Sequence, residues 1–215
     1  MITDIHSHIV FGVDDGACNL AQSRAMLNRA ASAGIDEIVA TPHVKICKPL
    51  DFSLFNQNFE VVKREAEAVN ITLRKGYEIS YYSLSQEGIE NAGRFVIEGT
   101  SLLLLEMPFF EPLPDHWLCV INRLLSKSIT PILVHPERTV EFRENSGLIK
   151  QARDMGCLVQ VTAGDVGDGV IRRWMKQHLV DFLGFDAHRE CDYQHAAKII
   201  HKFPSFFEFS SRSSD

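Results

Sequence analysis

Short runs of apolar residues recur along this chain and predict a series of β-strands. They cover residues 2–5, 37–41, 71–77, 102–105, 131–134, 158–162 and 182–185. Between these runs, apolar positions recur with the spacing of an amphipathic helix. The clearest stripe places five apolar side chains at i, i+4, i+7, i+11 and i+14, namely Phe55, Phe59, Val62, Ala66 and Val69. The chain therefore alternates between strand and helix patterns about seven times.

Capping residues and prolines mark the starts of the predicted helices. Asn19, with Gln22 three residues later, resembles a capping box, and Gly34 follows the last turn of the same helix. Pro114 and Asp115 begin another strong helix. Weaker helical patterns cover residues 84–91, 145–155, 168–178 and 193–203.

The alternation of strands and helices indicates an α/β fold with a parallel sheet covered by helices. Seven such units in about 205 residues favour a small, irregular (β/α) barrel that is closed or nearly closed, and a doubly wound open sheet is the alternative. In both architectures, functional residues gather at the carboxyl ends of the strands. We expect one domain over residues 1–209 and a polar tail that frays over residues 210–215.

Composition places the chain among ordinary globular proteins, with 45% hydrophobic and 23% charged residues. A net charge of −6 argues against nucleic-acid binding, which favours a basic surface. No apolar run approaches the roughly 20 residues of a membrane span, and no signal peptide is visible. The five cysteines are scattered, odd in number and form no CxxC pair, which favours a reducing cytoplasm.

Six of the seven apolar runs end in side chains that bind metal ions. Only the run at 158–162 does not, because it leads into Ala163 and Gly164. The carboxyl ends of parallel strands meet at one edge of a sheet, so these side chains should converge on a pocket for several metal ions. The candidate ligands are His6, His8, His43, Glu78, Glu106, His135, Asp186 and His188.

The spacing of these residues supports a shared site. His6 and His8 alternate along an extended chain and therefore face the same side, as do Asp186 and His188. A pair of structural histidines is the alternative for an isolated HxH pattern. Glu106 follows four leucines, where an unpaired carboxylate is costly to bury. It requires a cation, which is either a metal or the side chain of an Arg or Lys.

Mixed imidazole and carboxylate ligands suit Mn, Fe or Zn, and eight candidates are too many for one ion. Two or three ions about 3.5–4 Å apart generate hydroxide at neutral pH, and such clusters hydrolyse phosphate esters. A guanidinium is the natural additional contact for the phosphate oxygens. Arg138, three residues after His135, is the first candidate for this contact, and Arg189, directly after His188, is the second.

A second chemistry is suggested by Cys18 and Arg24, which have the C-x5-R spacing of cysteine-dependent phosphatases. Those enzymes require a tight loop that surrounds the phosphate and a thiolate of low pKa. The five intervening residues contain no glycine and have a helical pattern. We therefore expect this spacing to be accidental.

The sequence resembles the polymerase-and-histidinol-phosphatase (PHP) superfamily, specifically its bacterial protein tyrosine phosphatases linked to capsule and exopolysaccharide biosynthesis. The matching stretches run in family order from residue 2 to about residue 190. They are Asp4-Ile-His-Ser-His-Ile, Phe11-Gly-Val-Asp-Asp-Gly-Ala, Ile38-Val-Ala-Thr-Pro-His43, Gly76-Tyr-Glu-Ile79, Leu104-Leu-Glu-Met-Pro108, Pro131-Ile-Leu-Val-His-Pro-Glu-Arg138, Val161-Thr-Ala-Gly164 and Asp186-Ala-His188.

This resemblance implies a distorted (β/α)7 barrel with a trinuclear, commonly manganese-dependent site formed by the eight residues above. It implies that Arg138 binds phosphate and makes Asp14, in the Asp-Asp-Gly loop, a candidate for proton transfer. The implied substrate is phosphotyrosine on the tail of a bacterial tyrosine autokinase that controls polysaccharide export. The implied location is the cytoplasm, and the sequence leaves the oligomeric state open.

The chain departs from the family pattern near the predicted pocket. The family usually has Asn directly after Asp-Ala-His and an arginine about five residues after the histidine. In this chain Arg189 stands directly after His188, and Tyr193 stands at the later position. Arg189 is therefore a candidate replacement for the second phosphate contact. The loop at residues 108–114 offers Phe109 and Phe110 as a wall for an aromatic ring, with packing against a helix as the alternative. Lys45 and Lys48 are candidate contacts for an acidic phosphopeptide, with solvated surface lysines as the alternative.

Two other classes of function remain open from the sequence. One is another hydrolase on the same type of fold, either a small-molecule phosphatase such as one for histidinol phosphate or an amidohydrolase-like enzyme. The other is a non-catalytic PHP module that keeps its metals for stability. The two internal glutamates, Arg138 and the Asp-x-His pattern favour a phosphatase over the amidohydrolase-like enzyme, and the complete ligand set argues against a non-catalytic module.

Overall fold

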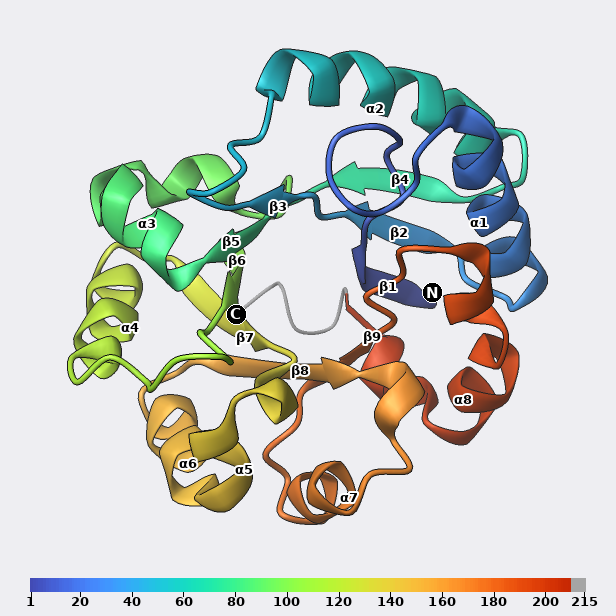
Figure 1. The fold of residues 1–215 in the computed structure, drawn as a ribbon. Helices are drawn as coiled ribbons and strands as arrows, with labels where there is room; N and C mark the ends of the chain where they lie inside the picture. The colour runs from blue at the N-terminus through green and yellow to red at the C-terminus, as the bar shows by residue number, and fades with distance from the viewer. Residues whose placement is uncertain (210–215) are drawn as a thin grey trace.

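The computed structural model describes residues 1–209, and the predicted polar tail at 210–215 lies outside the described residues. The chain alternates between strands and helices (Figure 1). The strands are β1 Thr3–Ser7, β2 Glu37–Ala40, β3 His43–Val44, β4 Thr72–Lys75, β5 Glu78–Ser80, β6 Leu102–Glu106, β7 Thr130–Val134, β8 Leu158–Thr162 and β9 Phe182–Gly184.

The α-helices are α1 Leu20–Ser32, α2 Phe52–Glu67, α3 Tyr81–Glu87, α4 Trp117–Ser126, α5 Val140–Glu144, α6 Ser146–Asp154, α7 Gly169–Lys176 and α8 Ala196–Lys202. Short 3-10 helices connect several elements. They are η1 Ile89–Phe95, η2 Pro136–Arg138, η3 Ala163–Asp165, η4 Glu190–Tyr193 and η5 Pro204–Phe207. Among residues 1–209, none of these helices has the length and apolar character that crossing a bilayer requires.

All seven predicted strands are present, as β1, β2, β4, β6, β7, β8 and β9. Two additional short strands were not predicted. After β2, Pro42 interrupts the strand because it has no backbone N–H, and His43 then begins β3. The third run likewise ends at Lys75, and Glu78 begins β5 after Gly76 and Tyr77. His43 and Glu78 therefore lie at the starts of short strands and not directly after long ones.

The strands form two sheets in which every pairing is parallel, as predicted for an α/β fold. One sheet has the order β1-β2-β4, and the other has the order β3-β5-β6-β7-β8-β9. A parallel bridge between Ser7 and Ala187 joins the end of β1 to the segment after β9, and the backbone N–H of His8 donates to the carbonyl of Ala187 at 2.8 Å. Figure 1 shows the strands around the centre of the molecule with the helices outside.

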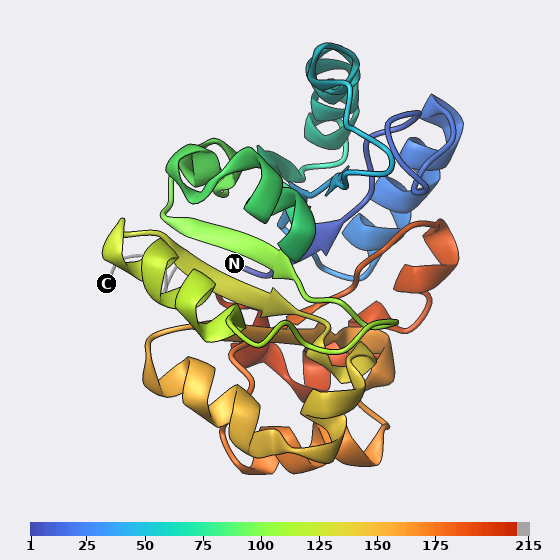
Figure 2. The same cartoon turned by 60° about the vertical axis from the view of Figure 1, so that its left-hand side comes forward.

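The predicted helices are present with shifted boundaries. Asn19 Oδ1 accepts a hydrogen bond from the backbone N–H of Gln22 at 3.1 Å, so the predicted cap of α1 is confirmed. The apolar stripe of α2 is buried except for Val69, which follows the helix. In Figure 2 this teal helix stands at the top of the molecule. The pattern at 84–91 is divided by Gly88, whose φ of +80° ends α3 before η1 begins.

Apolar side chains are buried in two clusters. The larger cluster lies between the strands and the surrounding helices and includes Phe55, Leu103 and Trp174. The smaller cluster contains alternate residues of the strands, such as Leu102 and Leu104 of β6. Successive strand residues point to opposite faces, so both faces of the strands are covered. This packing fixes the strands and therefore the positions of the side chains at their ends.

Candidate metal centre

Imidazole and carboxylate groups from distant parts of the chain meet at the carboxyl ends of the strands. Three overlapping groups of such side chains have ligand-type atoms within 4.8 Å of one another. Seven of the eight predicted ligands belong to these groups, and His135 lies beside them. The groups are His6, His8, Glu78 and Asp186; His43, Glu78 and Glu106; and His8, Asp15, His43 and His188.

The most deeply buried group is centred on two carboxylate oxygens. Glu78 Oε2 lies 3.4 Å from the Nε2 atoms of both His6 and His8. Asp186 Oδ1 lies 3.3 Å from Nε2 of His6 and 3.2 Å from Nε2 of His8. All four side chains are buried. Because β1, β5 and the segment after β9 supply them, the group depends on the whole arrangement of strands.

Glu78 belongs to two of the groups. Its Oε2 lies 2.6 Å from Nδ1 of His43, and its Oε1 lies 2.6 Å from Nε2 of His135. The Oε1 atom of Glu106 lies 4.0 Å from the same His135 nitrogen. Glu78 is therefore shared by two ligand groups and would contribute to both if each held an ion.

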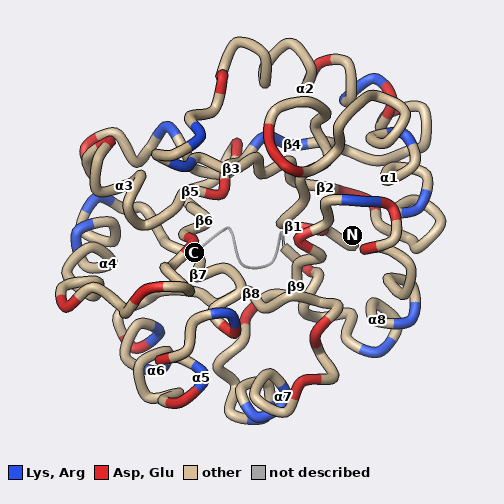
Figure 3. Tube along the Cα trace, in the orientation of Figure 1, with Lys and Arg blue, Asp and Glu red and all other residues tan. Residues whose placement is uncertain are grey.

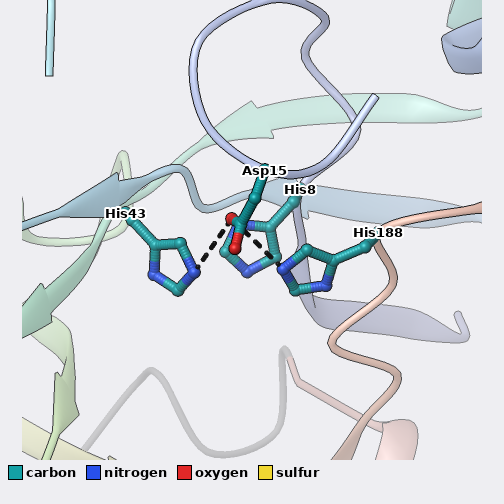
Figure 4. Close-up of side chains that lie close together, drawn as sticks. All are labelled: His8, Asp15, His43 and His188. Atoms are coloured by element: carbon teal, nitrogen blue, oxygen red, sulfur yellow. Dashed lines mark ion pairs between the residues drawn. The ribbon is translucent and has the colours of Figure 1, made fainter. Parts of the chain in front are cut away.

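The third group lies at the mouth of the site, beneath the loop between β1 and α1 (Figure 4). Asp15 Oδ1 lies 3.3 Å from His43 Nε2 and 3.5 Å from His188 Nε2. The side chain of Asp15 is 66% exposed. The sequence analysis named Asp14 of the same Asp-Asp-Gly loop as a candidate but did not identify Asp15 as a ligand.

Unpaired polar atoms test whether these residues suit a metal ion. Glu78 Oε2, Asp186 Oδ1 and His43 Nδ1 are buried without a hydrogen-bond partner among the described residues. Leaving such atoms unpaired is costly, and all three belong to the groups above. A bound cation would satisfy all three atoms, so the site fits divalent metal ions.

Side chains behind the centre hold two of its histidines in place. Gln160 Oε1 lies 2.9 Å from Nδ1 of His6, and Asp14 Oδ2 lies 2.7 Å from Nδ1 of His8. Such contacts fix the ring orientation and leave Nε2 available to a metal. Gln160 lies in β8, the strand that ends without a ligand. The sequence analysis did not identify Gln160, although a glutamine between valines in a buried strand indicates a polar partner.

Asp14 makes several further contacts that bear on its predicted role. Its carboxylate also accepts the backbone N–H groups of Gly16 and His43. Burial would raise the pKa of Asp14, but the hydrogen bond and charge of His8 lower it to about 2. A carboxylate of such low pKa is a weak base, so the geometry favours a positioning role, and proton transfer by Asp14 stays a prediction.

The Asp-Asp-Gly loop requires glycine at position 16 for a steric reason. A Cβ atom at Gly16 would lie 2.1 Å from the carbonyl oxygen of His8. Only glycine permits this close approach, which brings the loop against β1 and lets Asp14 reach His8.

The charges of these buried side chains compensate one another. Burial would raise the pKa of Glu78, but the charge of His6 and the close contacts with His135 and His43 hold it well below its usual value. Burial would lower the pKa of His8, but its contacts with Asp14 and Asp186 raise it well above its usual value. Metal ligands must be deprotonated, so ions entering this site would displace protons from the imidazoles.

Two of the predicted ligands have a strained backbone. His135 has φ of +34° and Asp186 has φ of +49°, in the left-handed region that side chains other than glycine rarely adopt. Such conformations cost of the order of 1–3 kcal/mol and persist at functional sites where the surrounding structure enforces them. Here they direct both side chains toward Glu78 and the histidines.

Basic side chains approach the centre from two sides. Arg138 Nη2 donates to Asp186 Oδ2 at 2.6 Å, and its side chain is 39% exposed. Arg138 and Arg189 both line a cavity of 690 Å³ beside Asp186 and His188. On the other side, Lys45 Nζ lies 3.2 Å from His43 Nε2 and 3.5 Å from Glu106 Oε2. Glu106 thus has the ammonium partner that the sequence left open as an alternative to a metal.

The C-x5-R spacing does not form a phosphate site. Residues 20–24 are the first turns of α1, and Arg24 pairs with Glu65 through an Nη2–Oε1 distance of 2.7 Å. Cys18 is exposed and precedes the helix cap. The expectation that this spacing is accidental agrees with the structure.

Comparison with known proteins identifies the family. The family described as "Capsular polysaccharide synthesis, CpsB/CapC" matches residues 2–202. The chain belongs to this family. Among individual CpsB/CapC relatives, the tyrosine-protein phosphatase YwqE of Bacillus subtilis is 29% identical over 202 residues, which cover 86% of this chain and 76% of that protein.

Two further comparisons support the same relationship within the CpsB/CapC family. The putative tyrosine-protein phosphatase CapC of Staphylococcus aureus is 29% identical over 197 residues, which cover 87% of this chain and 77% of that protein. A solved structure from a study of YwqE from Bacillus subtilis and CpsB from Streptococcus pneumoniae superposes with a TM-score of 0.81 at 27% identity. It covers 98% of this chain and 89% of that chain, and its description calls these proteins metal-dependent tyrosine phosphatases.

Proposed function

We propose that this chain is a metal-dependent protein tyrosine phosphatase. The observation that carries the proposal is the set of three overlapping ligand groups, joined through His8, His43 and Glu78, beside a cavity lined by Arg138. The names of the CpsB/CapC relatives support the reaction, because several are tyrosine-protein phosphatases.

The proposed cofactor is two or three divalent transition ions, with Mn first and Fe or Zn as alternatives. The proposed ligands are the eight predicted residues together with Asp15. The ions would supply an activated water and neutralise phosphate charge. Gln160 and Asp14 orient His6 and His8, and burial of the centre excludes bulk water from these imidazoles.

Arg138 is the proposed phosphate contact among the protein side chains. Its guanidinium is partly exposed in the cavity, and its fork of donors matches the geometry of phosphate oxygens. Its contact with Asp186 holds it at the edge of the centre. Arg189 lines the same cavity and is the proposed second contact.

The aromatic ring of the substrate has a candidate wall beside Glu106. Glu106 lies between the metal groups and a cavity of 160 Å³ lined by Tyr82, Phe109 and Phe110. Phe110 is 92% exposed. An exposed aromatic side chain beside a charged centre suits a substrate that has one charged end and one apolar ring.

We further infer that the two sheets form one distorted, closed (β/α)7 barrel and one domain. The bridge between Ser7 and Ala187 supports this inference, because it connects β1 with the segment after β9. The direct succession of β2 and β3, and of β4 and β5, supports continuity between the two sheets.

The proposed biological setting follows from the family. We infer that the substrate is the phosphotyrosine tail of a bacterial tyrosine kinase that regulates polysaccharide export, and that the chain acts in the cytoplasm without binding nucleic acid. The acidic net charge argues against a nucleic-acid site, and Figure 3 shows acidic positions in red among the strand ends near the centre, which agrees with a site for metals. The oligomeric state is left open.

One purified sample tests the proposed function. Chelation should abolish hydrolysis of para-nitrophenyl phosphate, and Mn²⁺ should restore it. The same sample should hydrolyse a phosphotyrosine peptide with higher kcat/KM than histidinol phosphate. Preference for histidinol phosphate would replace the proposal with a small-molecule phosphatase, and metal-independent turnover would refute it.

A further inference from the structure

A trough leads away from the metal centre along the junction of α1 and η4. The 690 Å³ cavity beside the centre is lined in part by Arg189 and Cys191. Both residues also line a second cavity of 500 Å³, together with Ala25 of α1. Ala25 and Cys191 also line a third cavity of 610 Å³, which reaches Arg29. Each cavity shares lining residues with the next, so the three lie in a row along this junction.

The walls of this trough are the helix after β1 and the segment after β9. Figures 1 and 2 show these two segments side by side, and they contact each other. The lining residues extend from Asn19, the N-cap of α1, to Ser32, which corresponds to about 20 Å at a rise of about 1.5 Å per residue. An extended polypeptide advances about 3.3 Å per residue, so the trough spans about six residues.

The chemistry of the trough suits a polypeptide backbone. Asn28 and Gln194 line its far end and carry amide groups that both donate and accept hydrogen bonds. Within residues 1–209, the guanidinium groups of Arg29 and Arg189 form no ion pair, and both line the trough. Glu190 is the one carboxylate shared by the second and third cavities. Two unpaired cations against one carboxylate favour an acidic peptide.

We propose that this trough binds the extended segment on one side of the phosphotyrosine, with acidic side chains directed at Arg29, while Arg189 lies where the trough meets the phosphate cavity. This inference rests on the proposed phosphatase function and narrows its substrate to acidic polypeptides, as opposed to small phosphomonoesters. The phosphate lies in the 690 Å³ cavity, and the flanking residues follow α1.

A steric substitution tests the trough. Ala25 lines the second and third cavities but not the first, so Ala25→Trp fills the trough away from the centre. The matched control is Asn122→Trp on α4, an exposed helical position across the molecule from α1 (Figure 1). We expect Ala25→Trp to lower the ratio of kcat/KM for a long phosphotyrosine peptide to kcat/KM for para-nitrophenyl phosphate about tenfold. The control should change this ratio less than about twofold.

A charge substitution provides a second, less disruptive test. Arg29 and Arg123 are both basic residues in the last turn of their helices, so Arg29→Glu and Arg123→Glu alter the helix dipole in the same way. We expect Arg29→Glu to raise KM for a peptide with acidic flanks about fivefold, with little effect on a peptide with neutral flanks. Arg123→Glu should affect neither.

The outcomes separate this inference from the proposed function. If the Mn²⁺-loaded wild type hydrolyses para-nitrophenyl phosphate but has the same kcat/KM for free phosphotyrosine and for the long peptide, the trough is refuted and the phosphatase function stands. An equal ratio of kcat/KM for the long peptide to kcat/KM for para-nitrophenyl phosphate in Ala25→Trp and Asn122→Trp would refute the trough as well. Absence of all phosphatase activity in wild type would refute both proposals.

Discussion

The hydroxyl of Tyr193 donates a hydrogen bond to Asp4 Oδ2 at 2.7 Å, and the two residues are 189 positions apart in the sequence. The other oxygen of Asp4 accepts the backbone N–H groups of Phe185 at 2.9 Å and His6 at 3.3 Å. Asp4 therefore connects the strand that supplies two histidines to the segment that supplies Asp186. Tyr193 is buried, and its hydroxyl serves this structural contact.

Tyr193→Phe should lower the free energy of unfolding of the metal-free protein by about 1–3 kcal/mol, because it leaves a buried Asp4 oxygen without its donor. Chemical denaturation measures this change. Tyr82→Phe is the matched control, since Tyr82 is 40% exposed and its hydroxyl donates to Glu111 at the surface. The control should cost less than about 0.5 kcal/mol. An equal effect for both substitutions would contradict the role of the Asp4 contact.

Gln160→Leu should weaken metal binding about 10- to 100-fold, because His6 loses the hydrogen bond that orients its ring. Gln160→Glu keeps an acceptor at the same place and should retain more affinity. Titration of the metal-free variants with Mn²⁺ by calorimetry gives the comparison. Wild-type affinity in Gln160→Leu would show that His6 needs no such support.

Arg138→Ala should lower kcat at least about 10²-fold, since it removes a positioned donor to the phosphate oxygens. Metal content should remain that of the wild type, because Arg138 contacts Asp186 but provides no ligand. Arg172→Ala, at an exposed position of α7, is the control and should leave turnover unchanged. Turnover of Arg138→Ala at the wild-type rate would remove this residue from the mechanism.

Alkylation of the native protein should modify exposed cysteines and leave most of the hydrolysis of para-nitrophenyl phosphate intact. Cys18, Cys47, Cys119 and Cys191 are exposed, whereas burial raises the pKa of the Cys157 thiol to about 12. Cys157 should therefore stay unmodified until the protein unfolds. Mass spectrometry after iodoacetamide treatment identifies the sites. Complete inactivation upon modification of Cys18 would revive a cysteine-based mechanism.

The sequence predicted the seven long strands because buried parallel strands form continuous apolar runs, as at Leu102–Glu106. It predicted that the side chains after these runs would gather, since parallel strands end at one edge. It did not predict β3 and β5, because strands of two and three residues carry too little pattern. Their positions depend on breaks at Pro42 and Gly76.

Contacts between side chains that are distant in the sequence could not be predicted for a different reason. The partners Gln160 and His6, or Lys45 and Glu106, are set by strand register and rotamers, which no local pattern encodes. The role of Asp15 could not be predicted for the same reason. Asp14 and Asp15 are adjacent and of the same residue type, and only the conformation of the loop places Asp14 against His8 and Asp15 against His43.

Metal content tests the central claim most directly. Purified protein stripped with a chelator, reloaded with Mn²⁺ and passed through a desalting column should carry about two to three ions per chain by elemental analysis. Glu78→Gln, which alters the carboxylate shared by two ligand groups, should carry fewer. Folded wild-type protein that retains no transition metal after loading would contradict the account.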